Sequence, residues 1–214
     1  MINPADISAC IQSGSTRETG ILVDRAIREK HPPVFILREG LAAGIIEMQK
    51  RYQRDEILDS ELLISEIAFR AGLRRLKPVI ETDRNGFSGT VITGTLEGDI
   101  RDTEKDLASC LMRSLGLNVI DLGTCVSSKS FIKAAVDEKA RIIVCAVSLV
   151  SFLSQMEALV KAASQANIRP RTKILLSGGP VTEWFCKYID ADLYAPDLIQ
   201  AADMAAEFCG RSAS

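Results

Sequence analysis

The segment GTLEGDIRDTEKD, residues 94–106, joins a glycine-rich turn to charged side chains at the start of a predicted helix. Glycine after a strand lets the backbone come close to a ligand. Asp99 and Arg101 stand at the mouth of the helix, where a metal-binding imidazole would be expected. The guanidinium of Arg101 has five donors and no acceptor, so it offers a metal no lone pair. The turn therefore predicts a ligand site that lacks a metal ligand.

Beyond residue 85, short β-rich runs alternate with helical segments. Continuous apolar strands separated by helices indicate a parallel sheet covered on both faces. In such sheets, ligands bind beyond the carboxyl ends of the strands. We predict strands at 90–95, 118–123, 141–149, 172–179 and 192–196, and helices at 103–115, 128–139, 153–167, 181–188 and 197–208.

The loops after these strands are rich in glycine and small hydroxyl residues, which can hydrogen-bond a phosphate or an amide group. They are GTLEGDIRD (94–102) after the first strand, VSLVSF (147–152) after the third and SGGPVT (177–182) after the fourth. We expect a nucleotide-like ligand at these loops.

The first part of the chain has a helical period instead. Segments 16–30, 34–54 and 60–76 carry apolar residues at spacings of three and four, which indicates a small helical bundle. The third helix is predicted to begin at Asp59 or Ser60 and to stop before Pro78. The polar, turn-rich segment TDRNGFSG (82–89) separates the two parts, so we place one domain at 1–85 and another at 86–214.

Composition excludes several classes of function. The 214 residues carry a formal charge of −2, which argues against nucleic acid as a partner, and the longest apolar run, 142–153, is too short for a membrane span. The six cysteines form no C-x-x-C pair, so we expect reduced thiols, no protein-built zinc or iron–sulfur site, and a cytoplasmic protein. The single histidine, His31, is interpreted as a loop or helix-entry residue.

Three common nucleotide folds fail at named positions. Gly94 and Gly98 lack the third glycine of a dinucleotide fingerprint, and a Walker loop is missing. A phosphorylated receiver domain would need an acidic residue at the end of the third strand, where this chain has Ala146, Val147 and Ser148.

One family resemblance remains. GTLEGDIRDTEKDLASCLMRSLGLNVIDLG is similar to the corrinoid proteins of cobalamin-dependent methyltransferase systems, with their G-D-x-H-D-x-G motif followed by a helix and G-x-x-V-x-D-L-G. Ser148 and the Gly178–Gly179 pair match later motifs of the family, while Val150 stands where leucine is usual. IDADLYAPD and the segment 37–78 also resemble family segments, so the match runs from about residue 34 to the end.

The resemblance implies a helical cap domain and a flavodoxin-like cobalamin-binding domain. In the family, the motif histidine binds cobalt from below and the neighbouring aspartate orients it. Here Arg101 occupies the histidine position, which implies cobalamin without a protein histidine ligand. Glu104 replaces the motif glycine, where the family keeps room for the nucleotide tail of the cofactor. Asp99 remains, and we expect it to form a salt bridge with Arg101 or to cap the following helix.

The resemblance assigns cofactor contacts and neither catalytic nor metal-ligating residues on this chain. Gly94 and Gly98 are alternatively simple turn glycines, and Ser148 and Ser154 alternatively capping or solvated hydroxyls. The expected cofactor-binding residues are Gly94, Thr95, Gly98, Asp99, Arg101, Asp102, Glu104, Ser148, Val150, Ser154, Gly178 and Gly179.

The function implied is that of a methyl carrier, a subunit and not a complete enzyme. It would bind cobalamin or a related corrinoid, receive a methyl group from a substrate-specific methyltransferase and pass it to an acceptor methyltransferase. The alternative is a cofactor-sensing or scaffold paralogue that has lost methyl transfer, and Arg101 and Glu104 favour it because both alter one motif.

Overall fold

The structure, a computed structural model, describes residues 2–82, 89–147 and 149–210. The chain forms two compact units, Met1–Arg84 and Asn85–Ser214. The domain boundary predicted between residues 85 and 86 lies outside the described residues. None of the helices within the described ranges combines the length and the apolar content that a membrane span requires.

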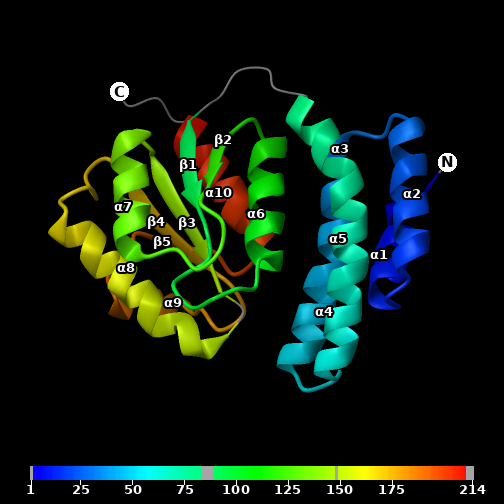
Figure 1. Cartoon of the computed structure of the whole chain (residues 1–214), viewed down its shortest axis with the longest axis horizontal. Helices are drawn as coiled ribbons and strands as arrows, with labels where there is room; N and C mark the ends of the chain where they lie inside the picture. Colours follow the sequence, from blue (N-terminus) through cyan, green and yellow to red (C-terminus); the bar gives the residue numbers. More distant parts are fainter. Residues whose placement is uncertain (1, 83–88, 148, 211–214) are drawn as a thin grey trace. The chain divides into compact units, whose positions relative to one another are not determined.

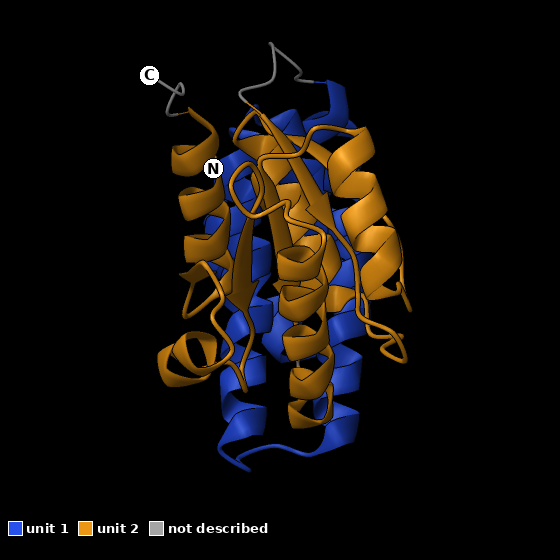
Figure 2. Ribbon diagram, turned by 90° about the vertical axis from the view of Figure 1, so that its left-hand side faces the viewer, with its two compact units in different colours: residues 1–84 blue, residues 85–214 orange. Residues whose placement is uncertain are grey.

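The first unit is a helical bundle, as predicted (Figures 1 and 2). Its core is a stripe on one long helical segment, where Leu37, Leu41, Ile45 and Met48 are almost completely buried. His31 lies in the loop between the second and third helices, which confirms its interpretation as a loop residue. The helices are α1 (Pro4–Gln12), α2 (Thr16–Arg28), α3 (Pro33–Phe35), the π-helical turn η1 (Ile36–Ala42), α4 (Ala43–Gln53) and α5 (Asp59–Thr82).

The prediction was wrong about the end of the last helix of the bundle, and it did not locate the first helix. Helix α1 was not foreseen, although Asn3 caps it by accepting a hydrogen bond from the Ala5 N–H at 3.1 Å and Pro4 occupies its first turn. Helix α5 does not stop before Pro78 but continues to Thr82. A proline removes one helical donor, but buried Ile80 and a bond from the Thr82 hydroxyl to the Pro78 carbonyl at 3.1 Å hold the last turn.

The second unit is a five-stranded parallel sheet with the order β2-β1-β3-β4-β5, which confirms the predicted doubly wound, flavodoxin-like fold. Helix α6 packs against α10, and α7 packs against α8, all four of which are labelled in Figure 1. The strands are β1 (Thr90–Thr93), β2 (Asn118–Asp121), β3 (Ile142–Ala146), β4 (Lys173–Ser177) and β5 (Leu193–Tyr194), and the helices are α6 (Thr103–Ser114), α7 (Ser128–Asp137), the 3₁₀ turn η2 (Val150–Phe152), α8 (Leu153–Gln165), α9 (Glu183–Tyr188) and α10 (Leu198–Gly210).

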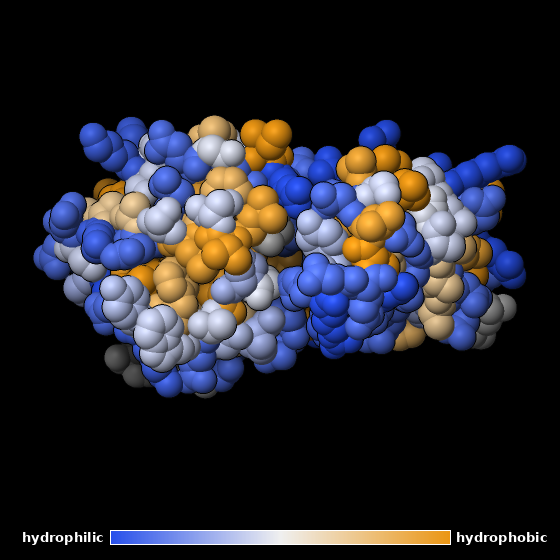
Figure 3. Space-filling view, turned by 90° about the horizontal axis from the view of Figure 1, so that it is seen from below, coloured by the Kyte–Doolittle hydropathy of each residue, from blue (hydrophilic) through white to orange (hydrophobic). Residues whose placement is uncertain are grey.

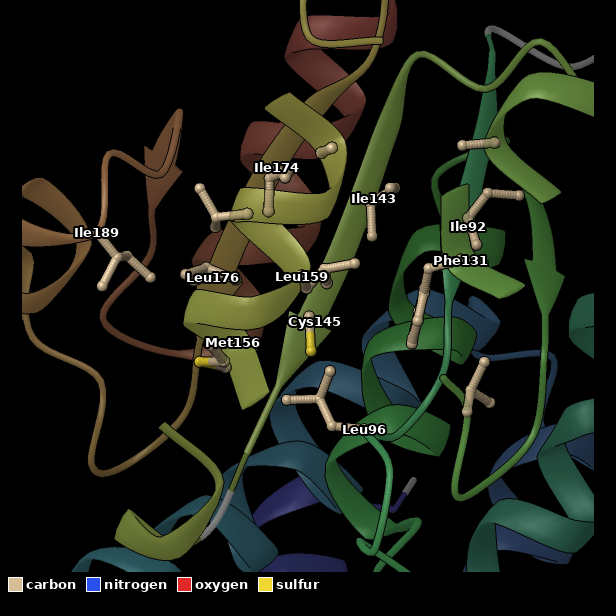
Figure 4. Packing of buried hydrophobic residues seen from close by; sticks show 14 of the residues in the cluster. Ile92, Leu96, Phe131, Ile143, Cys145, Met156, Leu159, Ile174, Leu176 and Ile189 are labelled. Carbon is tan, nitrogen blue, oxygen red and sulfur yellow. The ribbon is translucent and has the colours of Figure 1, made fainter. Parts of the chain in front are cut away.

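The core between the sheet and helices α7 and α8 consists of side chains from the strands and from both helices. Phe131, Ile143, Leu159 and Ile174 are fully buried there (Figure 4). Continuous burial of all five residues of β3 fixes this strand at the centre of the sheet. Because all strands are parallel, the loops that follow them lie along one edge of the sheet, which we call the carboxyl edge.

Candidate functional site

The carboxyl edge carries apolar side chains that face solvent. Ile100, in the loop after β1, is 78% exposed, and Val150, at the start of η2, is 70% exposed. Figure 3, which views the molecule from below, shows apolar residues gathered on this side of the second unit. Exposed apolar groups beside turn glycines suit a flat, largely apolar ligand.

Thr95 locks two of the loops together. Its hydroxyl donates to the Asp99 carbonyl at 2.5 Å and accepts from the Cys125 N–H at 2.9 Å. Its backbone N–H donates to the Gly123 carbonyl at 3.0 Å, and its carbonyl accepts from the Val126 N–H at 2.9 Å. The loop after β1 is thus fixed to the loop after β2.

Asp99 lies beneath this turn and is only 2% exposed. Its Oδ1 accepts from the backbone N–H of Arg101 at 2.9 Å, whereas Asp102 is the N-cap residue of α6. The expectation that Asp99 caps this helix was therefore wrong, because its carboxylate closes the preceding turn. Burial raises the pKa of the Asp99 carboxyl, although the Arg101 N–H bond and the Arg101 charge pull that pKa down. The Arg101 side chain is exposed.

Gly98 also occupies this turn, with a φ of +86° that favours glycine. A β-carbon on Gly98 would lie 3.7 Å from Cε1 of Phe152, so η2 lies close to the turn. Gly94 is buried, and a β-carbon there would meet Cζ of Phe131 at 3.0 Å. Packing accounts for Gly94, and backbone conformation accounts for Gly98.

Two residues missed by the sequence prediction contact these loops, Cys125 from the loop after β2 and Lys105 from the first turn of α6. Cys125 is exposed, and its Sγ accepts from the Gly98 N–H at 3.2 Å. Lys105 is 6% exposed, and its Nζ lies 2.5 Å from Asp106 Oδ1 and 2.6 Å from Asp121 Oδ2. Burial lowers the pKa of Lys105, but its bonds to both carboxylates leave it above the ordinary value. A lysine in a charged first helical turn normally signals only a solvated surface, so the sequence held no sign of this pairing.

The end of β4 places a glycine of positive φ beside a buried hydroxyl. Gly178 has a φ of +117°, and a β-carbon there would stand 2.0 Å from the Val147 carbonyl oxygen. The preceding Ser177 is completely buried, and its hydroxyl has no hydrogen-bond partner among residues 2–82, 89–147 and 149–210. Gly179 is exposed. A buried hydroxyl beside two glycines suits a ligand with polar atoms.

The remaining predicted site residues lie apart from the Thr95 network. Ser154 is exposed in the first turn of α8, and Glu104 is 7% exposed in the first turn of α6. Ser148 lies outside the described residues. The network thus joins Thr95, Gly98 and Asp99, while Val150, Ser154 and the glycines after β4 belong to other loops of the same edge.

Comparison with known proteins gives a consistent result. Family models described as B12 binding domains match residues 89–203 and 5–77. The dimethylamine corrinoid protein of Methanosarcina barkeri is 27% identical over 192 residues, 89% of this chain and 90% of that protein. Trimethylamine corrinoid protein 1 of Methanosarcina acetivorans is 28% identical over 175 residues, 81% of each chain. The solved monomethylamine corrinoid protein of Methanosarcina barkeri shares the fold, with a TM-score of 0.80, 23% identity and coverage of 94% and 96%.

Proposed function

The chain belongs to the B12-binding domain family, and from this premise we propose that it is a corrinoid-binding methyl carrier without a protein histidine ligand. Family membership establishes a corrinoid as the cofactor. The observation that carries the finer proposal is the turn 98–101, where exposed Arg101 stands in place of the motif histidine and Asp99 binds the Arg101 backbone.

The residues of the carboxyl edge fit a corrinoid. Within the described residues the buried Ser177 hydroxyl has no hydrogen-bond partner, and the exposed Gly179 beside it carries no side chain that would keep a polar tail away. Ile100 and Val150 offer exposed apolar contacts to the macrocycle. The contact residues we propose are those that the sequence predicts in the loops after β1, β3 and β4.

The bound corrinoid supplies cobalt for methyl transfer, and the protein supplies orientation and electronic tuning. Thr95 and Asp99 hold the backbone of the turn after β1 through bonds to the Asp99 carbonyl and the Arg101 N–H. Arg101 adds a permanent positive charge that cannot bind the metal. His31 lies outside the motif turn, and its Nε2 is 3.5 Å from Glu29 Oε2, which argues against a role as the cobalt ligand.

We further propose that two methyltransferases use this carrier. The relatives are named as dimethylamine and trimethylamine corrinoid proteins, which supports a substrate-specific methyltransferase as donor and an acceptor methyltransferase as recipient. Residues 1–85, the helical unit, would serve as a cap domain. Residues 86–214, the α/β unit, would hold the cofactor. The chain would act as a carrier subunit, since its proposed site residues bind and orient the corrinoid.

A second candidate is a sensor or scaffold that has lost methyl transfer. Buried Glu104 and exposed Arg101 favour it, because both change the same motif. A scaffold without cofactor would remain colourless after incubation with hydroxocobalamin and gel filtration. A sensor would bind the cofactor but, once chemically reduced, would fail to take up a methyl group from methyl iodide.

The carrier proposal expects both binding and methyl uptake, each measured by the visible spectrum of the protein fraction. Gly179→Phe is the matched control, because Gly179 is exposed and its backbone lies outside the left-handed region. We expect this variant to fold and to lose the corrinoid. Colourless wild-type protein would refute the carrier, as would a loaded protein that rejects the methyl group.

A further inference from the structure

Lys105 stands between two carboxylates, and only one of them touches a loop of the proposed site. We propose that Lys105 is a positioning residue, which acts through Asp121 to hold the loops after β1 and β2. The inference rests on the proposed function, because it assigns these loops to the corrinoid.

A continuous series of bonds connects the lysine to the turn. Lys105 Nζ contacts Asp121 Oδ2 at 2.6 Å, and Asp121 Oδ1 accepts from the Gly123 N–H at 2.9 Å. The Gly123 carbonyl accepts from the Thr95 N–H at 3.0 Å. The Thr95 hydroxyl then donates to the Asp99 carbonyl at 2.5 Å. Asp121 Oδ2 contacts the lysine and Asp121 Oδ1 accepts from Gly123. The lysine therefore fixes the carboxylate in the orientation that holds the Gly123 N–H.

The positive charge is what this arrangement requires. Lys105 is 6% exposed, and its neighbours Asp106 and Asp121 are partly buried carboxylates within 2.6 Å of one nitrogen. Without the ammonium group, the two carboxylates would repel each other and turn toward water. Asp121 would then release the Gly123 N–H, and the anchor of Thr95 would weaken.

The effect should stay local. Strands β1 and β2 pair through their own backbone from Thr90↔Asn118 to Thr93↔Asp121. That ladder does not need the Lys105 side chain. Loss of the lysine therefore loosens loops 94–101 and 121–126 and leaves the centre of the sheet intact.

The two carboxylates of Lys105 supply a matched comparison. Lys105→Met removes the charge, whereas Asp106→Asn removes one partner of the lysine and spares its contact with Asp121. Amide hydrogen exchange of the full-length apoprotein would be followed by NMR. In Lys105→Met we expect the Gly123, Thr95 and Cys125 amides to exchange about tenfold faster, while β3 and β4 amides keep their rates. Asp106→Asn should exchange as the wild type does.

A second variant keeps the test decisive if Lys105→Met does not fold. Asp121→Asn retains an oxygen for Gly123 but loses the charge that the lysine orients. Its Gly123 and Thr95 amides should exchange several-fold faster. Unchanged rates in the folded variants would overturn the inference, and so would an Asp106→Asn variant that behaves like Lys105→Met. Faster exchange throughout the second unit would mark Lys105 as a general stabilising residue and also overturn it.

Titration with hydroxocobalamin tests the link to the site. The dissociation constant should rise about tenfold in Lys105→Met and stay unchanged in Asp106→Asn. Loosened loops with unchanged affinity would refute the positioning role. Wild-type protein that binds no hydroxocobalamin would refute the proposed function instead. The amide exchange rates of the apoprotein would still test whether Lys105 stabilises the hydrogen bonds that lead to Thr95.

Discussion

A β-carbon on Gly178 would lie 2.0 Å from the carbonyl oxygen of Val147, so the backbones after β3 and β4 come very close together. The φ of Gly178 is +117°, which a side chain rarely adopts. Both facts require glycine at position 178 for the local backbone geometry, whether or not a ligand binds there.

We predict that Gly178→Ala lowers the free energy of unfolding by about 3 kcal/mol, the sum of backbone strain and displacement of Val147. Gly123→Ala separates the two causes. Gly123 has a φ of +83°, but a β-carbon added there would meet no atom within 4 Å, so only about 1 kcal/mol should be lost. Urea unfolding of both variants provides the measurement, and equal losses would contradict the clash.

Much of the fold could be predicted because periodicity reports burial. The period-two and continuous apolar runs located all five strands, and the stripe through Leu37, Leu41 and Ile45 located the bundle core. The end of α5 was not predictable from Pro78 alone, since buried Ile80 decides it from outside the local sequence.

Only the site residues that belong to a short sequence motif could be predicted. Glycines after strands predicted the loops that follow β1 and β4 as ligand-binding loops, and this stays a prediction. The hydroxyl of Thr95 and the ammonium of Lys105 act across loops distant in sequence, from Asp99 to Cys125 and from α6 to Asp121. The spacing of residues along the chain does not predict such contacts, whereas a helix cap or a turn depends on residues that are adjacent in sequence.

We predict that Asp99→Asn stabilises the protein at neutral pH. Burial raises the pKa of Asp99 in the folded state, so this residue favours folding below the ordinary aspartate pKa, and that contribution is lost as pH rises through the folded pKa. Asparagine keeps an oxygen for the Arg101 N–H and carries no charge. Free energies of unfolding measured from pH 3 to pH 7 should coincide at the acid end and diverge in favour of the variant above it. Asp137→Asn, at an exposed carboxylate, serves as the control. A variant that is less stable than the wild type at pH 7 would contradict the prediction.

Glu104 is only 7% exposed, and we propose that the nucleotide tail of the corrinoid passes at its position. We predict that Glu104→Gly tightens hydroxocobalamin binding about fivefold, the equivalent of ~1 kcal/mol, because no carboxylate then has to be displaced. Glu183→Gly, at an exposed first-turn glutamate of α9, controls for glycine in a helix. An unchanged or weaker affinity in Glu104→Gly would show that the tail does not pass there.

We predict that no protein imidazole binds cobalt from below. Protein uniformly labelled with nitrogen-15 and loaded with the cobalt(II) corrinoid should give the same electron paramagnetic resonance splitting as unlabelled protein, since Arg101 has no lone pair to offer. His31→Ala should leave that spectrum unchanged, because His31 lies outside the turn 98–101 and contacts Glu29. A splitting that changes with the isotope and disappears in His31→Ala would be decisive against the prediction.

The last prediction concerns the reduction of cobalt. An axial imidazole donates electron density and favours the oxidised metal, whereas a nearby guanidinium favours the electron-rich one. Arg101→His combined with Glu104→Gly restores the imidazole and opens the pocket, and Asp99 lies two residues away to orient it. The midpoint potential of the cobalt(II)/cobalt(I) pair should then fall by about 60 mV or more, the equivalent of a tenfold shift toward the oxidised state.

Two control variants separate the contributions to this shift. Glu104→Gly alone opens the pocket without a new ligand, and Arg101→Gln with Glu104→Gly removes the positive charge without supplying an imidazole. Spectroelectrochemistry should place the Arg101→Gln variant between the wild type and the histidine variant, because loss of the guanidinium lowers the potential less than gain of a ligand. If the histidine variant binds cobalamin and its potential does not fall, Arg101 does not lie below cobalt. The sensor or scaffold would then be the better account of this motif, since its two altered residues would no longer have a part in tuning the metal.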